Sequence, residues 1–341
     1  MDYVITGGSG YIGSRLVEHL AAREDTGRIV VCDVRPPAAF RPKVEFEHLD
    51  VRDREAARSL LERVKPDALV HLAFILNPVH DEHFMYDVDV NGTHNVLEAA
   101  GAAGTEQVLV ATSAVAYGAF PDNPVPLTED DPVRGVAGFS YARDKTESDR
   151  LCQLWAAKYP DRTMTIVRPC IVFGPNVDNY LVRLWTKAPF QVDVGNLENE
   201  LQFVHEGDVA DAVIRLLEGR HEGPFNVAAD GLMTLRETLE LSGQPIRRMP
   251  LWLYRLLGRV MWGIRLAETP PGQIEFAIYP WIVSNERLKQ VAGWQPRYTS
   301  RETFEITMRA QDKLPPGGPA PSTTVATATD GAASAEPSQV A

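Results

Sequence analysis

Cysteine is scarce in this 341-residue sequence, which contains only Cys32, Cys152 and Cys170. The three are far apart and form no Cys-x-x-Cys pair. The sequence therefore predicts neither a disulfide framework nor a zinc site. A protein of a reducing compartment is the simplest expectation.

Long apolar runs, basic blocks and a charged leader are also missing. No uncharged apolar stretch reaches the roughly 18 residues that a membrane-spanning helix needs. With a formal net charge of -12 and no basic block, the chain is not expected to bind a nucleic-acid backbone. No positively charged segment precedes the first apolar run. We expect a cytoplasmic protein without a stable membrane span, whose partner is a small molecule.

Short apolar runs alternate with helical patterns from residue 1 to about residue 171. The runs lie at 3–5, 29–31, 68–72, 108–111 and 165–167, and one further run lies at 223–229. Helical spacing is clear at 54–64 and 91–100. Strands that are regularly separated by helices predict an α/β fold with a parallel sheet covered on both faces.

Two later segments depart from this pattern. Residues 249–267, MPLWLYRLLGRVMWGIRLA, are unusually apolar and aromatic for a helix. Because apolar stripes at helical spacing usually pack inward, we expect core or a dimer contact here. A hydrophobic substrate wall and an interfacial membrane helix stay open as alternatives. Residues 313–341 are poor in large apolar side chains, and we predict a disordered tail.

Three glycines, Gly7, Gly10 and Gly13, lie between the first apolar run and a helical pattern at 14–20. In a strand-to-helix turn of this kind, backbone N–H groups and the helix dipole can hold a phosphate. The G-x-x-G-x-x-G spacing is one residue wider at its start than the commonest dinucleotide fingerprint. Asp33 ends the next predicted strand, where a carboxylate can bind the adenosine ribose hydroxyls. The sequence thus predicts a dinucleotide site.

The residues after the second and third predicted strands bear on the choice of dinucleotide. The negative charge of Asp33 repels a 2′-phosphate and favours NAD over NADP. Arg35 keeps NADP open, because a guanidinium can pair with that phosphate. Asp50 and Val51 suit the adenine edge. The alternative for Asp33 is a solvated carboxylate at a strand end.

Tyr141 is the only one of the ten tyrosines that has a lysine, Lys145, four residues later. On a helix this spacing places phenol and ammonium on one face, where the positive charge is expected to lower the pKa of the phenol. Such a phenol can exchange a proton with a carbinol oxygen while hydride moves to or from a nicotinamide. An isolated pair would more simply be a surface contact.

Ser113 follows the apolar run at 108–111. Because ligands of open sheets bind at the carboxyl ends of strands, this hydroxyl is a candidate to hold the reacting oxygen. A buried hydroxyl that caps the strand end is the alternative.

A series of motifs in fixed order carries a family resemblance. They are Gly7-Gly10-Gly13, Asp33, HLA at 71–73, GT at 92–93, TSAVAYG at 112–118, Tyr141 with Lys145, RPCIVFGP at 168–175, FVHEGDVADAV at 203–213 and GWQPRYT at 293–299. With them the sequence resembles the extended short-chain dehydrogenases/reductases. Within these it is similar to the NAD-dependent epimerase/dehydratase group, which includes the nucleotide-sugar 4-epimerases. The resemblance covers residues 1 to about 306.

This resemblance implies a Rossmann-type doubly wound parallel sheet with a smaller C-terminal α/β substrate domain, usually in a homodimer. It implies an NAD-binding Rossmann domain at 1–180, to which 203–230 returns, and a substrate-binding domain at 181–202 and 231–312.

The resemblance also implies roles for single residues. Tyr141 would be the general acid/base, Lys145 would lower its pKa and hold the nicotinamide ribose, and Ser113 would hydrogen-bond the substrate oxygen. The further cofactor contacts that it implies are Gly7, Gly10, Tyr11, Ile12, Gly13, Leu72, Ala73, Pro169 and Val172.

Three departures from the family pattern concern the substrate. Asp89 stands where members usually carry an asparagine. Ile171 and Leu201 replace the asparagine and arginine that usually contact the diphosphate of a sugar nucleotide, and Glu198 and Glu200 nearby are acidic. The replacements remove charge-assisted hydrogen bonds, and the carboxylates are expected to repel a diphosphate.

Three functions therefore stay in view. The leading one is an NAD-dependent epimerase or dehydratase that acts on a nucleotide sugar. The second is a 3β-hydroxysteroid-dehydrogenase-like oxidoreductase that acts on a hydrophobic alcohol. The third is an NAD-sensing protein without catalysis.

His80 and His83, with Asp81 and Glu82, lie in the segment 77–83 after the fourth predicted strand. They could in principle bind a metal, but loop histidines without a fixed scaffold rarely do, and we predict no metal site. We expect them to shape the mouth of the substrate site or to face solvent.

Overall fold

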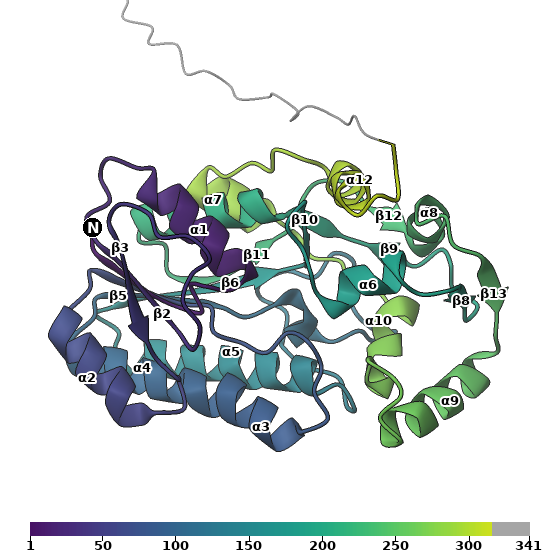
Figure 1. The fold of residues 1–341 in the computed structure, drawn as a ribbon, viewed down its shortest axis with the longest axis horizontal. Coiled ribbons are helices and arrows are strands. Elements are labelled where there is room, and N and C mark those ends of the chain that lie inside the picture. Colours follow the sequence, from purple (N-terminus) through teal and green to yellow (C-terminus); the bar gives the residue numbers. More distant parts are fainter. Residues whose placement is uncertain (316–341) are drawn as a thin grey trace, which may run out of the picture.

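A seven-stranded parallel sheet forms the centre of the protein (Figure 1). The structure is a computed structural model that describes residues 1–315, so the predicted tail lies outside the described residues except for its first three. The strands are β1 Tyr3–Thr6, β2 Ile29–Asp33, β3 Val44–His48, β4 Ala68–His71, β5 Gln107–Ala111, β6 Thr163–Pro169 and β11 Gly223–Val227. Their order in the sheet is β11-β6-β5-β4-β1-β2-β3, and all neighbours are parallel.

The chain winds outward from β1 in both directions. It runs from β1 through β2 to β3 and then returns to β4 on the other side of β1. This arrangement confirms the predicted α/β class with a doubly wound parallel sheet. In such sheets the crevice beyond the carboxyl ends of the strands where the order reverses, here between β1 and β4, is the usual place for a ligand.

Helices cover both faces of the sheet (Figure 1). On one face lie α2 Arg54–Val64, α4 Gly92–Ala103 and α5 Ser140–Lys158, and on the other lie α1 Tyr11–Ala21 and α7 Glu206–Glu218. Alternate strand residues face the two sides, so that Val30 and Leu69 pack in one apolar cluster and Val31 and Val70 in the other. Burial on both faces explains why the strands read as continuous apolar runs.

A π-helical turn, Asp87–Asn91, joins α3 Glu82–Tyr86 to α4. Such turns inside helices are rare and often mark functional sites. This one carries Asp89 into the interior, where its side chain is fully buried. The position thus lies on a distorted turn, outside the regular part of the helix.

Most of the smaller strands and helices lie beyond the carboxyl edge of the large sheet. Their strands pair as β7 Ile171–Phe173 with β10 Phe203–His205, β8 Gln191–Asp193 with β13 Ile246–Arg248, and β9 Glu200–Leu201 with β12 Met233–Thr234. Their helices are α6 Tyr180–Thr186, α8 Leu235–Leu241, α9 Leu251–Gly263, α10 Glu275–Ile278 and α12 Ser300–Ala310, whereas α11 Glu286–Ala292 packs against β11 of the large sheet and against α7. In Figure 1, α6, α8, α9 and α10 lie to the right of the large sheet.

Helix α9 corrects one expectation. None of its residues, all of which the structure describes, is buried, so of the two expectations for 249–267, core or a dimer contact, the first is wrong and the second stays a prediction. The helix lies at the margin of the molecule beside α10, away from the large sheet (Figure 1). Within residues 1–315, no helix is both long enough and apolar enough to cross a membrane.

Candidate active site

A cavity of about 690 Å³ lies between the carboxyl edge of the large sheet and the smaller elements. Its size is typical of small-molecule sites. The glycine turn lines one end, the ends of β4, β5 and β6 line the middle, and α6, α8 and α9 line the other end. The predicted site residues in its lining are Gly7, Gly10, Tyr11, Ile12, Gly13, Leu72, Ser113, Tyr141, Lys145, Pro169 and Val172. Asp33, Asp50, Val51 and Ala73 lie outside this lining.

The glycine turn packs closely against the end of β4. Gly7 has a φ of +71°, and a Cβ built on it would lie 2.5 Å from the nitrogen of Ala73. A Cβ on Gly13 would lie 2.3 Å from the carbonyl oxygen of Gly7. Both positions therefore require glycine. Because Gly10, the N-cap of α1, has no side chain to bind the first N–H groups, the helix presents its positive end to the cavity.

Asp33 is held beside the glycine turn. Its carboxylate accepts hydrogen bonds from the backbone N–H groups of Ser9 and Arg35, both at 3.2 Å. Asp50 is bound by the guanidinium of Arg52, which lowers the pKa of Asp50. The structure thus places the Asp33 carboxylate beside the glycine turn at the end of β2, and Asp50 two residues beyond the end of the neighbouring strand β3.

Tyr141 and Lys145 lie on the first two turns of α5 and share the cavity wall. The Lys145 Nζ donates to the carbonyl oxygen of Ala111 at 2.8 Å. It also lies 3.4 Å from the ring centroid of Phe74 and 5.8 Å from that of Tyr141. Phe74, which the sequence did not reveal as a site residue, packs edge-on against Tyr141 with ring centroids 6.2 Å apart.

The pKa shifts of this pair differ from the predicted direction. Burial raises the pKa of Tyr141, the charge of Asp89 raises it further, and hydrogen bonding with Ser113 acts in the opposite direction. Burial lowers the pKa of Lys145, and Asp89 opposes that shift. The prediction that the spacing to Lys145 gives Tyr141 a lowered pKa is therefore wrong for this structure, because burial of the phenol dominates.

Asp89 is a buried carboxyl group whose charge acts on both of these residues. Its Oδ1 accepts a hydrogen bond from the Ile75 N–H at 2.8 Å, whereas Oδ2 has no partner among the residues that the structure describes. Burial raises the pKa of Asp89 well above its ordinary value, and Lys145 opposes the shift. The position that departs from the family pattern thus lies within electrostatic reach of the candidate catalytic pair.

Ser113 is buried at the end of β5. Its hydroxyl donates to the carbonyl oxygen of Pro169 at 3.3 Å and accepts from the Val115 N–H at 3.2 Å. The serine therefore caps the strand end, as the alternative interpretation holds, and at the same time lines the cavity beside Tyr141. The hydroxyl can therefore cap the strand end and also contact a ligand in the cavity.

The far end of the cavity is apolar. Ile171 and Leu201, the two residues at the family's diphosphate-contact positions, are buried and line it. The neighbouring apolar lining consists of Leu181, Leu184, Trp185, Phe190, Val192, Val194, Leu235, Leu239, Tyr254, Leu257, Met261, Ile274, Phe276 and Trp281. A diphosphate here would lose water without gaining charged partners from these side chains.

The acidic neighbours of Leu201 lie outside the cavity. Glu198 and Glu200 are exposed and absent from the cavity lining, and Glu198 pairs with Arg236 at 2.8 Å. They do not contact the cavity, and the expectation that their charge repels a bound diphosphate stays a prediction.

The segment 77–83 borders the same end of the cavity. The ring of His80 lies 3.9 Å from that of Trp262 on α9, and the Asn77 side chain accepts a hydrogen bond from the Tyr180 N–H at 3.0 Å. His83 lies in α3. Within residues 1–315, no group of three or more potential metal-binding side chains is placed to hold an ion.

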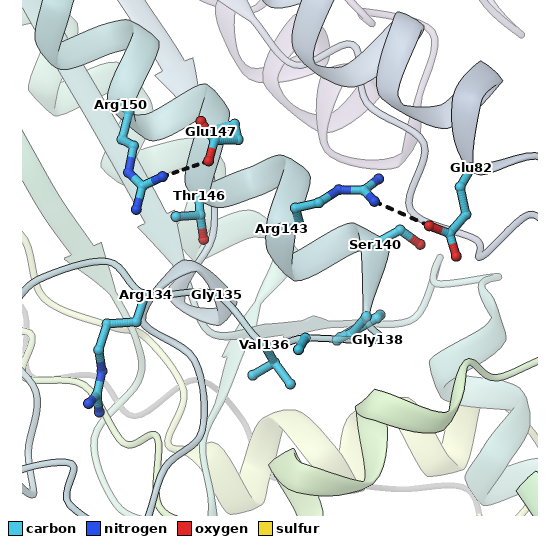
Figure 2. A pocket seen from close by; sticks show the side chains of 12 residues that line it. Glu82, Arg134, Gly135, Val136, Gly138, Ser140, Arg143, Thr146, Glu147 and Arg150 are labelled. Atoms are coloured by element: carbon cyan, nitrogen blue, oxygen red, sulfur yellow. Dashed lines mark hydrogen bonds and ion pairs between the residues drawn. The ribbon is translucent and has the colours of Figure 1, made fainter. Parts of the chain in front are cut away.

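A second hollow, of about 190 Å³, lies on the other side of the start of α5 (Figure 2). Its charged side chains are paired, Arg143 with Glu82 at 3.2 Å and Arg150 with Glu147 at 2.6 Å. Because each of these guanidinium groups has a carboxylate beside it, we assign no chemistry to this hollow.

Comparison with known sequences identifies relatives along most of the chain. The model of the NAD dependent epimerase/dehydratase family matches residues 3–228. UDP-glucuronic acid decarboxylase 4 of Arabidopsis thaliana is 30% identical over 329 residues, which cover 90% of this chain and 67% of that protein. An uncharacterized protein of Mycobacterium tuberculosis is 23% identical over 322 residues, 92% of this chain and 84% of that protein.

Solved structures share the fold. The complex of UDP-glucose 4-epimerase from Thermus thermophilus with NAD is 24% identical and has a TM-score of 0.72, over 92% of this chain and 99% of that one. The complex of dTDP-glucose 4,6-dehydratase from Bacillus anthracis with NAD is 18% identical and has a TM-score of 0.70, over 92% and 97% of the two chains.

Proposed function

Because the chain belongs to the NAD-dependent epimerase/dehydratase family, we propose that it is an NAD-dependent enzyme that moves a hydride at a secondary alcohol or the corresponding ketone. One observation carries this proposal. Ser113, Tyr141 and Lys145 line the same cavity as the glycine turn, so proton exchange and a bound dinucleotide would meet in one place.

The residues at the glycine end fit a dinucleotide. Gly7 and Gly13 leave no room for a Cβ, and the positive end of α1 suits a diphosphate. Asp33 suits the hydroxyls of the adenosine ribose, and its charge favours NAD over NADP. Asp50, Val51, Leu72, Ala73, Pro169 and Val172 are the further proposed contacts. When bound, NAD supplies a hydride acceptor and, once reduced, a hydride donor.

Side chains of the protein carry out the proton transfer. Tyr141 exchanges a proton with the substrate oxygen, and Ser113 fixes that oxygen by turning toward it the hydroxyl proton that the Pro169 carbonyl accepts in the free protein. The raised pKa of Tyr141 keeps the phenol protonated at neutral pH, so that it is ready to act as an acid toward a ketone. Lys145, fixed by the Ala111 carbonyl, holds the nicotinamide ribose.

A nucleotide sugar is the first candidate substrate. It is supported by the family and by relatives and structural neighbours that are named for UDP- and dTDP-sugar reactions. A nucleotide-sugar epimerase would reduce and reoxidise the cofactor within one turnover. No net NADH would then accumulate.

A hydrophobic secondary alcohol is the second candidate, and the lining of the cavity favours it. Ile171 and Leu201 face the ligand where a diphosphate would need donors. An oxidoreductase acting on such an alcohol would release NADH in step with the ketone formed. The third function, NAD sensing without catalysis, is disfavoured because the tyrosine, lysine and serine are all present in the cavity.

A direct assay separates these functions. The protein is incubated with NAD and either UDP-glucose, dTDP-glucose or a 3β-hydroxysteroid, while NADH absorbance and the sugar products are followed. Epimerised or dehydrated sugar without net NADH supports the first candidate, and stoichiometric NADH from the steroid supports the second. NAD binding without turnover of any substrate in a broad alcohol and ketone panel would favour sensing.

Tyr141→Phe is the matched control for this assay. The loss of a general acid/base is expected to lower kcat by about 10²–10⁴-fold. NAD binding should be retained, because the substitution leaves the glycine turn intact. An unchanged kcat would remove Tyr141 from the mechanism.

The composition also supports a cytoplasmic protein. The family resemblance supports a homodimer and a substrate-binding domain at 181–202 and 231–312. Size-exclusion chromatography with light scattering tests the homodimer. A monomer at all concentrations would contradict it.

A further inference from the structure

Helix α9 turns an apolar face to solvent. Trp252, Leu256 and Val260 follow one another at intervals of four, so they lie on one side of the helix, and Ile264 continues the row at its end. Their exposed fractions are 67%, 51%, 51% and 60%. A row of large apolar side chains exposed to this degree marks an interaction surface.

The adjacent face of α9 forms a wall of the large cavity. Tyr254, Leu257 and Met261 line that cavity. Leu257 and Met261 are also 40% and 42% exposed, so the cavity reaches the outside beside this helix. The exposed row and the mouth of the cavity are therefore neighbours.

All the charged residues between 246 and 267 are positive. Between residues 246 and 267 the sequence contains five arginines and neither aspartate nor glutamate, although the chain as a whole carries a net charge of -12. The arginines are Arg247, Arg248, Arg255, Arg259 and Arg265. Arg255 is bound by Glu275, whereas Arg248, Arg259 and Arg265 are exposed. The segment thus combines an apolar row with a local excess of cations.

We propose that the outer face of α9 docks on the surface of an anionic lipid bilayer. Helices with Trp and Leu on one face and Arg beside it lie in the plane of a membrane interface, with their apolar face among the acyl chains. Arginines near a membrane surface attract anionic headgroups; Arg259 lies on α9 itself, and Arg248 and Arg265 flank it. The helix is too short to span a bilayer, so it rests on the surface.

A second copy of the chain is a weaker fit for the same surface. A two-fold interface brings the same surface patch of both copies together, so the positive charges of this segment would meet in one contact area. Like charges placed across an interface oppose association. An anionic surface removes this conflict.

Docking would turn the mouth of the cavity toward the bilayer. A lipid-soluble ligand would then reach Tyr254 and Leu257 without crossing water. The docking itself does not depend on the proposed function, since it concerns the outer face of α9. Either result of the activity assay leaves it testable.

Vesicle flotation of the full chain tests the proposal. Vesicles of phosphatidylcholine alone are compared with vesicles that also contain phosphatidylglycerol, at low and at high salt. We expect flotation with the anionic vesicles, little with the neutral ones, and weaker flotation at high salt because exposed charges are screened.

Matched variants locate the binding surface. Ile264→Asp places a charge in the exposed row and should abolish flotation, whereas Leu154→Asp, at a position on α5 that is 67% exposed, should not change it. Arg259→Glu should lower the bound fraction at least about fivefold, and Arg63→Glu on α2 should not. Thermal unfolding of each variant shows that it is folded.

Three results would overturn the proposal. They are no flotation with anionic vesicles, equal flotation of Ile264→Asp and the unchanged protein, and a dimer that Ile264→Asp converts to a monomer. The last result would instead assign the surface to a contact between copies of the chain. Flotation by a protein inactive in every assay would leave docking intact and reject only the proposed function.

Discussion

Arg168 and Asp149 form a two-pronged ion pair in the interior, behind the strand ends that border the cavity. Both N–O distances are 2.8 Å, and the side chains are 2% and 0% exposed. Arg168 also donates to the Tyr117 hydroxyl at 2.7 Å, and the Thr112 hydroxyl donates to Asp149 at 3.0 Å. The pair therefore joins β6 to α5 and to the end of β5, the elements that place Pro169, Tyr141 and Ser113 around the cavity.

Arg168→Met is expected to destabilise the protein strongly. Removing the guanidinium leaves the Asp149 carboxylate buried without its main partner, which typically costs about 3–5 kcal/mol. Urea unfolding measures this loss. Arg236→Met, which breaks the exposed pair with Glu198, is the control and should change the unfolding free energy little. Equal stability of Arg168→Met and the unchanged protein would show that the pair is not essential to the fold.

Gly13→Ala is expected to abolish NAD binding. The added methyl group would lie 2.3 Å from the Gly7 oxygen and 2.7 Å from the Gly8 Cα, both of them backbone atoms that cannot move without opening the turn. The rise in Tm on addition of NAD reports binding and should disappear. At Gly263 an added Cβ would have no atom within 4 Å beyond its chain neighbours and the backbone of its own helix, so Gly263→Ala should keep the full rise. A normal rise in Gly13→Ala would place the dinucleotide elsewhere.

The parts of the fold that depend on local pattern could be predicted from the sequence. The predicted helix at 54–64 coincides with α2, because Asp53 caps its first turn and Ala57, Leu60, Leu61 and Val64 form its buried face. The buried strands were recognisable because both of their faces are covered, which leaves no polar alternation. The glycine turn followed from spacing and context alone.

The parts that depend on distant contacts could not be predicted. Periodicity shows that one side of α9 is apolar, but not that this side is uncovered in the folded chain. The spacing of Tyr141 and Lys145 shows that they share a helix face. The spacing gives no information on the burial of the phenol or on the charge of Asp89, which lies on another helix. Both raise the pKa of Tyr141.

Asp89→Asn is expected to shift the pH dependence of the reaction. The negative charge of Asp89 raises the pKa of both Tyr141 and Lys145, so a neutral amide of the same shape should lower both. The limb of the kcat profile that reports Lys145, whose pKa burial lowers to about 7, should move to lower pH. Asp87→Asn, at a half-buried position of the same π-helical turn, is the control and should leave the profile in place. An unmoved profile in Asp89→Asn would mean that the carboxyl group does not act on the pair.

The same substitution should change how stability depends on pH. The pKa of Asp89 is higher in the folded than in the unfolded chain, so the folded state binds the proton more tightly. Its contribution to stability is complete below the ordinary value of 3.8 and is lost as the pH rises through the raised pKa. The amide of Asp89→Asn does not titrate, so the variant lacks this loss. Its free energy of unfolding, measured in urea across this pH range, should therefore change less with pH. A parallel decline in both proteins would contradict the shift.

Leu201→Arg tests whether apolar side chains exclude a diphosphate from the cavity. Leu201 lines the cavity and is 4% exposed, so a guanidinium there would be buried and in need of an anion. A charge-assisted hydrogen bond contributes about 1.5–3 kcal/mol, and the variant should therefore bind UDP at least about tenfold more tightly than the unchanged protein in calorimetry. It should also lose turnover of a hydrophobic alcohol, since a cation would occupy the apolar end. Leu232→Arg, at a position 39% exposed outside the cavity lining, should leave both properties as they are. Tight binding of UDP by the unchanged protein, with no gain from Leu201→Arg, would show that the diphosphate is held by other groups and would favour the nucleotide sugar as substrate.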